Sequence, residues 1–152
     1  MATLAHHGEK SEIVELITFY VGNALCGMDI LNIQEINKHM DVTQVPQSPE
    51  YMLGVLNIRG KIVSILDLGR KLGLSHTKRT DSSRNVIVDS QNEHIGLLVD
   101  SISDVVPTDL DKVEPPPANI SGVQGRFFEG VFKTEDSLIG ILDIEEVLKE
   151  EA

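Results

Sequence analysis

The sequence lacks tryptophan, and aromatic residues make up only 4% of its 152 residues. A surface so poor in aromatic side chains is unsuited to stacking the bases of a single-stranded nucleic acid. Positive charge is also scarce, because 13 lysines and arginines face 24 aspartates and glutamates and leave a formal net charge of −11. Most of such a surface would repel a polyanion. The two shortages argue against nucleic acid as a partner.

Cysteine and long apolar runs are equally rare. Cys26 is the single cysteine, so an internal disulfide is excluded and a thiolate metal site cannot be built from it alone. No apolar stretch approaches the ~20 residues that span a bilayer. The first ten residues, MATLAHHGEK, lack the basic start and apolar middle of a signal peptide. We therefore expect a cytoplasmic chain in which Cys26 is a small buried residue.

Catalytic and ligand motifs are missing as well. Gly54 to Lys61 is a near miss for a phosphate-binding loop, with five residues between its glycines instead of four and Ile62 where a magnesium-binding hydroxyl should stand. The histidines show no metal-ligand spacing, and no nucleophile elbow is present. We expect a binding protein without metal or cofactor. A small enzyme with its site in a groove between two barrels is the alternative.

What is present is a pair of apolar runs around an Arg-Gly tip, GVLNIRGKIVSILDL, residues 54–68. Asn57 suits the first position of a type I turn, and Gly60 suits the left-handed residue that follows such a turn. The stretch therefore predicts a hairpin with Arg59 at its apex. Arg59 is either a turn residue chosen for solubility or a cation that docks against a partner, and the local pattern leaves both open.

The chain contains the same unit twice. In what we call the hairpin alignment, LGVLNIRGKIVSILDLGRKL, from Leu53, matches EGVFKTEDSLIGILDIEEVL, from Glu129, without a gap. In the upstream alignment, CGMDILNIQEI, from Cys26, matches IGLLVDSISDV, from Ile95. Two matches in the same order favour an internal duplication.

Each copy has the pattern of a strand, a tight turn, a longer bent strand, a loop and a hairpin. Short strands in such units usually close into small barrels, because closure removes exposed edges. We predict an all-β fold of two packed five-stranded barrels, at about residues 13–80 and 81–148, with a flexible N-terminus at 1–12 and a tail at 149–152. Asp67 and Asp143 each precede a short apolar run and predict two short helices, one of them C-terminal. A long loop is expected over residues 107–126.

Two isoleucine runs occupy equivalent places in the copies. Ile30, Ile33 and Ile36 recur at every third position, as do Ile102 and Val105 in the second copy. Core positions are one interpretation of these residues. The other is that both runs meet where the halves join and line a groove for a partner's helices. Charge is uneven too, since residues 59–84 hold seven basic and two acidic side chains whereas residues 85–152 hold four basic and fifteen acidic.

The segments ILNIQEI, VPQSPEYMLGVLNIRGKIVSILDL and IGLLVDSISDVV, in this order, resemble the chemotaxis coupling proteins of the CheW family from about Ile13 to Leu148. One departure is Ser64, where the family usually has proline. The resemblance implies two five-stranded SH3-like β-barrels around a shared core. It also implies a non-catalytic cytoplasmic scaffold that couples methyl-accepting chemoreceptors to the histidine kinase CheA at the inner face of the membrane. The alternative is a related module of a pilus, gliding or gene-regulatory array.

The resemblance also nominates binding residues. For the cytoplasmic tip of the receptor they are Ile30, Ile33, Glu35, Gly54, Arg59, Gly60, Gly96, Ile102 and Val105, and the three glycines are expected to allow close approach of a backbone. For the regulatory domain of the kinase they are Val42, Thr43, Gln44 and Pro46. Our hypothesis is that Arg59 pairs with an acidic or carbonyl group of the receptor's helical hairpin while the isoleucines bury its apolar face.

Overall fold

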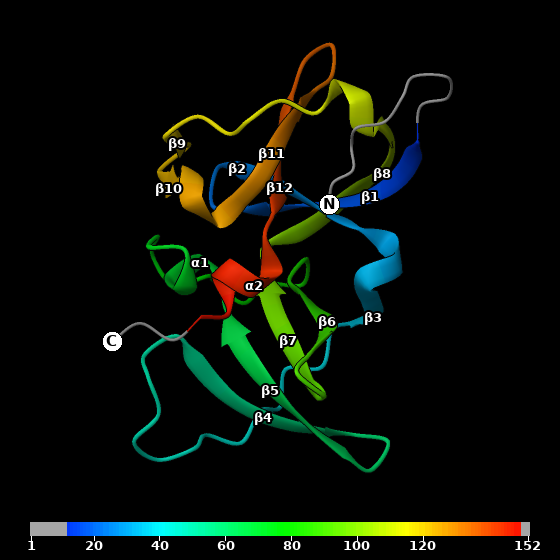
Figure 1. The fold of residues 1–152 in the computed structure, drawn as a ribbon. Helices are drawn as coiled ribbons and strands as arrows, with labels where there is room; N and C mark the ends of the chain where they lie inside the picture. Colours follow the sequence, from blue (N-terminus) through cyan, green and yellow to red (C-terminus); the bar gives the residue numbers. More distant parts are fainter. Residues whose placement is uncertain (1–11, 150–152) are drawn as a thin grey trace.

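The computed structural model describes residues 12–149 and consists mainly of two five-stranded sheets (Figure 1). The first sheet contains, in order across it, β11 (Phe128–Lys133), β12 (Leu138–Leu142), β2 (Ala24–Asp29), β1 (Ile13–Val21) and β8 (Ser101–Asp109). The second sheet contains β3 (Ile33–Asn37), β6 (Arg84–Ser90), β7 (Glu93–Val99), β5 (Lys61–Asp67) and β4 (Met52–Ile58). The predicted all-β class with two five-stranded units is therefore confirmed.

Short elements complete the described chain. They are the 3-10 turns η2 (Ile30–Asn32), η3 (Leu110–Lys112) and η4 (Gly125–Phe127), the two-residue strands β9 (Asn119–Ile120) and β10 (Val123–Gln124), and the helices α1 (Leu68–Lys71) and α2 (Ile144–Val147). Both helices were predicted, and each begins after a capping aspartate. Asp67 accepts a hydrogen bond from the Arg70 amide, and Asp143 accepts one from the Glu146 amide. α2 lies between the two sheets in Figure 1.

Each sheet combines strands from both sequence copies. β1 and β2 of the first copy join β8, β11 and β12 of the second, while β6 and β7 of the second copy join β3, β4 and β5 of the first. The order of equivalent strands is the same in both sheets. The ranges 13–80 and 81–148 therefore delimit two repeats in the sequence and do not delimit the sheets. The exchange arises because η2 carries the chain from β2 to the second sheet, and Asp100 carries it from β7 back to the first.

The register of the sheets follows the two sequence alignments. β12 pairs in parallel with β2 through Gly140 and Cys26, and β5 pairs in parallel with β7 through Ser64 and Ile95. Gly140 is the counterpart of Ser64 in the hairpin alignment, and Ile95 is the counterpart of Cys26 in the upstream alignment. The same backbone pair is thus made twice, which supports duplication as the origin of the fold.

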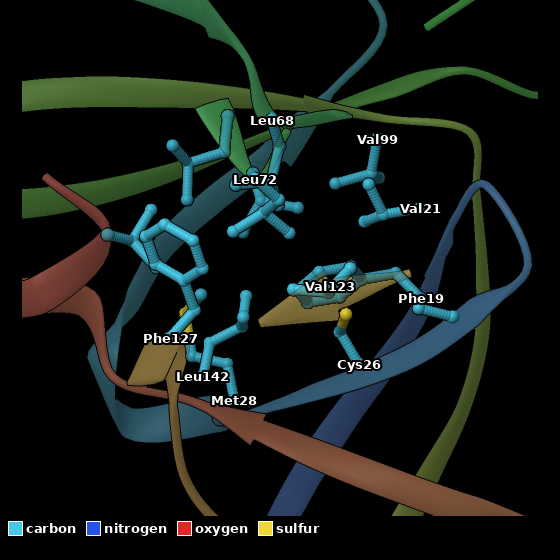
Figure 2. Packing of buried hydrophobic residues seen from close by; sticks show 14 of the residues in the cluster. Phe19, Val21, Cys26, Met28, Leu68, Leu72, Val99, Val123, Phe127 and Leu142 are labelled. Atoms are coloured by element: carbon cyan, nitrogen blue, oxygen red, sulfur yellow. The ribbon is translucent and has the colours of Figure 1, made fainter. Parts of the chain in front are cut away.

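The largest hydrophobic cluster lies between the sheets and is shared by both copies (Figure 2). It includes Phe19 and Cys26 from the first sheet and Val99 from the second. Each sheet also encloses a smaller cluster of its own, with Ile65 in one and Ile141 in the other. Cys26 is buried, as predicted, and burial raises the pKa of its thiol to about 12, which makes the thiol unreactive.

The position of a strand between two clusters explains the continuous apolar run in β6. Val86 and Val88 face the shared cluster, whereas Ile87 faces the cluster inside the second sheet. Successive side chains of a strand point to opposite faces, so all three are buried. A strand with apolar contacts on both faces needs no polar alternation.

Two local predictions need correction. The hairpin tip is a two-residue turn in which Arg59 and Gly60 both have positive φ, at 52° and 83°, and Ile58 pairs with Lys61. This is the pattern of a type I′ turn, which matches the twist of the strands better than the predicted type I turn does. The predicted loop over 107–126 is also partly structured, because β8 continues through Pro107 and β9, β10, η3 and η4 follow. Proline is tolerated there because β8 is an edge strand.

The predicted flexible N-terminus, residues 1–12, and the predicted tail, residues 149–152, lie almost wholly outside the described residues, which are 12–149.

Candidate functional site

The tip of the β4–β5 hairpin carries an ion pair between Arg59 and Glu35 of β3. β3 and β4 form opposite edges of the second sheet, so this contact shows how strongly the sheet curls. The Arg59 side chain remains 76% exposed, whereas that of Glu35 is 23% exposed. The pair fixes the guanidinium at the mouth of the curled sheet and leaves most of it open to a partner. The Asn57 side chain supports the tip by accepting a hydrogen bond from the Gly60 amide at 2.9 Å.

The side-chain amides of Asn37 and Asn85 form a hydrogen-bonded series that ends on the Glu35 carboxylate. The Asn37 amide group donates to Glu35 Oε2 at 2.9 Å, and the buried Asn85 donates to Asn37 Oδ1 at 3.1 Å and to the His39 carbonyl at 2.7 Å. The hydrogen bond from Asn37, followed by the one from Arg59, lowers the pKa of Glu35 below its ordinary value. Glu35 is therefore an anion at neutral pH, as pairing with Arg59 requires.

A hollow of about 200 Å³ lies beside this pair. Its apolar wall consists of Ile58, Val63 and Ile87. On the polar side, His94 Nε2 lies 3.4 Å from Lys61 Nζ, while His94 Nδ1 contacts the Asp89 carboxylate. Arg59, Lys61 and His94 thus surround a small apolar surface with nitrogen atoms, and those of Arg59 and Lys61 are donors.

Of the residues nominated for the receptor, the structure brings Glu35, Arg59 and Gly60 together at this tip. Ile30, Ile33 and Ile102 are partly buried and pack against the shared core, and none of them lines the hollow beside Arg59. Val105 is 47% exposed on the edge strand β8.

Gly54 and Gly96, which were also nominated for the receptor contact, are both buried. A Cβ at Gly54 would lie 2.3 Å from the Thr43 carbonyl oxygen, and φ there is +148°. A Cβ at Gly96 would lie 2.6 Å from Ile65 Cδ1 and 2.9 Å from Ile87 Cδ1. The close approach that the structure shows at these glycines is to atoms of this chain.

The residues nominated for the kinase lie in the segment between β3 and β4. Val42 packs against the cluster inside the second sheet, and Thr43 exchanges two 2.9 Å backbone hydrogen bonds with Val55. Gln44 and Pro46 are exposed and border an open hollow of about 560 Å³. This loop is held at its start and presents its following residues to solvent.

Sequence reasoning missed Asn37, Asn85, Lys61 and His94. One signal could have found Asn37, because it lies two residues after Glu35 in a strand and such residues share a face. Lys61 follows Gly60 in the predicted hairpin and could have been found there. Asn85 and His94 join the site through strand pairing across the sheet, which a single sequence does not reveal.

Within residues 12–149 no group of three or more His, Cys, Asp or Glu residues is arranged to hold a metal ion. No helix of that part of the chain is long and apolar enough to cross a membrane. What the tip offers is a fixed cation, an apolar wall and donors for noncovalent contacts.

Comparison with known proteins decides the family. Residues 15–152 match the model of the CheW-like domain. The chain belongs to the CheW family. It is 31% identical over 143 residues to the chemotaxis protein CheW of Helicobacter pylori, covering 94% of this chain and 86% of that protein. It is 33% identical over 138 residues to the probable chemotaxis protein CheW of Rhizobium etli, covering 90% of this chain and 88% of that protein.

A solved CheW structure has the same fold. The crystal structure of the scaffolding protein TtCheW from Thermoanaerobacter tengcongensis matches with a TM-score of 0.83 at 31% identity, covering 95% of this chain and 94% of that one. The family predicted from the sequence is therefore confirmed.

Proposed function

We propose that this CheW-family scaffold uses the Arg59 tip to bind the cytoplasmic tip of a chemoreceptor and uses the β3–β4 loop to bind the kinase CheA. The CheW relatives are named chemotaxis proteins, and the matching structure is named a scaffolding protein. These names favour chemotaxis over a pilus, gliding or gene-regulatory array. The binding roles of individual residues are our proposal.

The fixed cation at the first tip is the observation that supports the receptor contact. Glu35 holds one end of the Arg59 guanidinium, while a guanidinium has five N–H donors. The remaining donors can reach a carboxylate or carbonyl of a helical hairpin seated at the mouth of the hollow that Ile58 and Val63 line. An apolar wall beside a charged group is the common arrangement for such a contact, because the wall excludes water around the pair.

The isoleucine runs extend the proposed receptor contact. Ile33 precedes Glu35 by two residues in β3, and Val105 is exposed on the edge of the other sheet. Ile30 and Ile102 keep part of their surface accessible while they pack on the shared core. Receptor helices that cross both edges would cover these aliphatic groups.

The kinase contact is proposed for Gln44 and Pro46, with Val42 and Thr43 anchoring the loop. The bridge between Thr43 and Val55 fixes where the loop leaves the sheet, so the exposed residues after it keep a defined position. This part of the proposal is independent of Arg59. The scaffold performs no catalysis, needs no cofactor and works in the cytoplasm, reaching the membrane only through its receptors.

The experiment that tests the proposal measures binding to a receptor fragment containing the cytoplasmic tip. Arg59→Ala should lower affinity by roughly 1 to 3 kcal/mol, since a partly desolvated pair is lost. The melting temperature should hardly change, because Arg59 is exposed. Binding at wild-type strength by the folded variant would refute the role of Arg59.

Glu135→Ala provides the matched control. Glu135 is the counterpart of Arg59 in the hairpin alignment and stands at the tip of the second hairpin. Its removal changes charge and size at an equivalent place and should leave receptor affinity within about twofold. Equal losses in both variants would show that truncation of either hairpin tip weakens binding and would contradict a specific role of Arg59, whereas a general charge effect would change affinity in opposite directions.

A further inference from the structure

The internal repeat places two equivalent seams between the sheets. One seam, which we call the closed seam, is bordered by Asp67 and Gly69 of the α1 region and by Asp100. The other, the open seam, is bordered by Asp143, Glu145 and Leu31. Asp143 and Glu145 are the counterparts of Asp67 and Gly69 in the hairpin alignment, and Asp100 is the counterpart of Leu31 in the upstream alignment. The two seams are therefore copies of one structural position.

The chain's own connector, residues 73–82, lies along the closed seam and lines the hollow there. The Thr77 amide donates to Asp67 Oδ2 at 3.0 Å, and the Leu74 amide donates to the Gly69 carbonyl at 2.8 Å. The Leu74 side chain packs against the shared core. The connector also carries two cations, Lys78 and Arg79, and His76 approaches Asp67 at 3.4 Å.

The open seam holds a hollow of about 490 Å³, and a hollow of about 470 Å³ lies between the connector and the sheets at the closed seam. The two differ in what lines them, because no connector residue lines the open seam. Leu31 stands at its rim with 82% of its surface exposed, the highest fraction among the large hydrophobic residues described. At the equivalent position of the closed seam, the Asp100 carboxylate accepts a hydrogen bond from the Gly22 amide at 2.6 Å. The floor of the hollow is apolar, with Leu16, Met28, Val88, Ile141 and Leu142 among its residues.

Every charged side chain that lines the open seam in the described part of the chain is acidic. These residues are Asp29, Asp89, Glu129, Asp143 and Glu145. Partial burial, followed by the nearby charges of Asp143 and Asp29, raises the pKa of Glu129 above its ordinary value. The seam thus combines an apolar floor with negative charge that the lining itself does not neutralise.

We propose that the open seam binds a short extended segment of a partner protein, one that carries lysine or arginine beside a branched aliphatic residue. The connector shows the type of segment that fits this position, because Leu74 packs against the core at the equivalent seam and Lys78 lines the hollow there. Glu145 replaces Gly69, so the partner's backbone lies farther from α2 than the connector lies from α1, and a cation fills the space. The surface is distinct from the Arg59 tip.

The test titrates the isotope-labelled full chain with a synthetic peptide of residues 73–82, GLSHTKRTDS, followed by NMR. Binding should shift the amide signals of Asn32, Gln34, Asp89 and Asp143 around the seam. A second peptide with glutamine in place of Lys78 and Arg79 should bind about fivefold more weakly, the effect expected for losing exposed ion pairs. Three results would overturn the proposal. They are the absence of shifts at several millimolar peptide, equal binding of both peptides, and shifts at the Arg59 tip in place of the seam.

Two charge variants localise the effect. Glu145→Lys in the seam should weaken binding of the basic peptide about fivefold, whereas Glu135→Lys at the second hairpin tip should change it by less than about twofold. Both residues are exposed, so both variants should fold. Equal weakening would show general attraction to an acidic chain and would contradict the proposal. If the seam signals shift with the concentration of the chain in the absence of peptide, the seam binds a second copy of the chain. That result would also contradict the proposal.

Discussion

The two hairpin tips occupy equivalent places in the repeat but carry opposite charge. Arg59 and Gly60 form the first tip, and Glu135 and Asp136 stand at the same alignment positions in the second. The first tip binds Glu35, whereas the residue equivalent to Glu35, Asp104, is exposed and makes backbone hydrogen bonds with the Thr18 hydroxyl. The fold alone therefore does not require the ion pair, which points to a role specific to the first copy.

Features that the copies share belong to the fold. Thr43 bridges Val55 in one copy, and Glu114 bridges Val131, the counterpart of Val55, in the other. Each bridge lies beside a glycine, Gly54 or Gly130. Because shared and unshared features are separated in this way, substitutions at paired positions distinguish structural residues from binding residues.

The largest effect is expected from filling the space at the two shared glycines. Gly54→Ala should lower the free energy of unfolding by about 4 kcal/mol, because the new Cβ meets a backbone oxygen and φ is positive. Gly130→Ala should cost about 2 kcal/mol, since its Cβ would lie 2.8 Å from the Glu114 carbonyl oxygen and 2.6 Å from a movable Val113 methyl. Denaturant titration measures both values.

Gly60→Ala serves as the control for these two variants. Gly60 also has positive φ, but nothing lies within 4 Å of its added Cβ. Its cost should be about 1 kcal/mol, the backbone term alone. A loss at Gly60 as large as that at Gly54 would contradict the crowding explanation.

The next effect concerns the isoleucines at equivalent positions. Ile33→Asp and Ile102→Asp should each lower the free energy of unfolding by about 2 kcal/mol, because both side chains pack partly against the shared core. Thermal melting checks this. If both variants remain folded at room temperature and only Ile33→Asp loses receptor binding, the receptor contact belongs to the first copy. Unchanged melting temperatures would show that neither side chain supports the core.

Part of this comparison could be predicted from the sequence. The two alignments correspond to paired backbone positions, and Asp67 and Asp143 cap helices as expected, because these features depend on local pattern and repetition. The exchange of strands between sheets could not be predicted, since a hydrophobic pattern shows which face is buried but not which strand lies alongside.

In the candidate site, too, individual residues could be predicted from the sequence but their contacts could not. Glu35 and Arg59 were both nominated, yet their contact depends on the curl of a sheet whose edges they occupy. Gly54 and Gly96 were assigned to a partner because a glycine indicates a close approach without indicating what approaches. Only the fold shows that the neighbours are Thr43 and the pair Ile65 and Ile87.

A smaller effect should follow from removing the amide behind the ion pair. Asn37→Ala should raise the pKa of Glu35 toward its ordinary value, because the Asn37 hydrogen bond is the largest cause of its lowering. A lowered pKa in the folded state stabilises the protein above pH 4.5, and this stabilisation is lost as pH falls through the folded-state pKa. The variant should lose about 1 kcal/mol at neutral pH and less in acid. NMR titration of the Glu35 carboxyl carbon follows the pKa directly.

Arg59→Ala should also raise the pKa of Glu35, since it removes both the hydrogen bond from Arg59 and the attraction of its charge. An unchanged pKa in the Arg59 variant would show that the ion pair does not hold the Glu35 carboxylate.

The smallest expected change in the free energy of unfolding is a stabilisation, opposite in sign to the changes above. It comes from a carboxyl of the open seam, Glu129, which is compared with Glu35 at the tip. The pKa of Glu129 is raised, so its charged form is less favourable in the folded chain and weakens it as pH rises past the ordinary value. Glu129→Gln should therefore stabilise the protein at neutral pH by about 0.3 kcal/mol and have no effect near pH 3, where the wild-type carboxyl is already neutral. Glu35→Gln should destabilise at neutral pH, because it removes a carboxylate that Arg59 and Asn37 hold. Thermal melts of both variants at the two pH values give the signs. Destabilisation by Glu129→Gln at neutral pH would show that the seam stabilises its own negative charge, and an empty seam would then have no electrostatic need for a cationic partner.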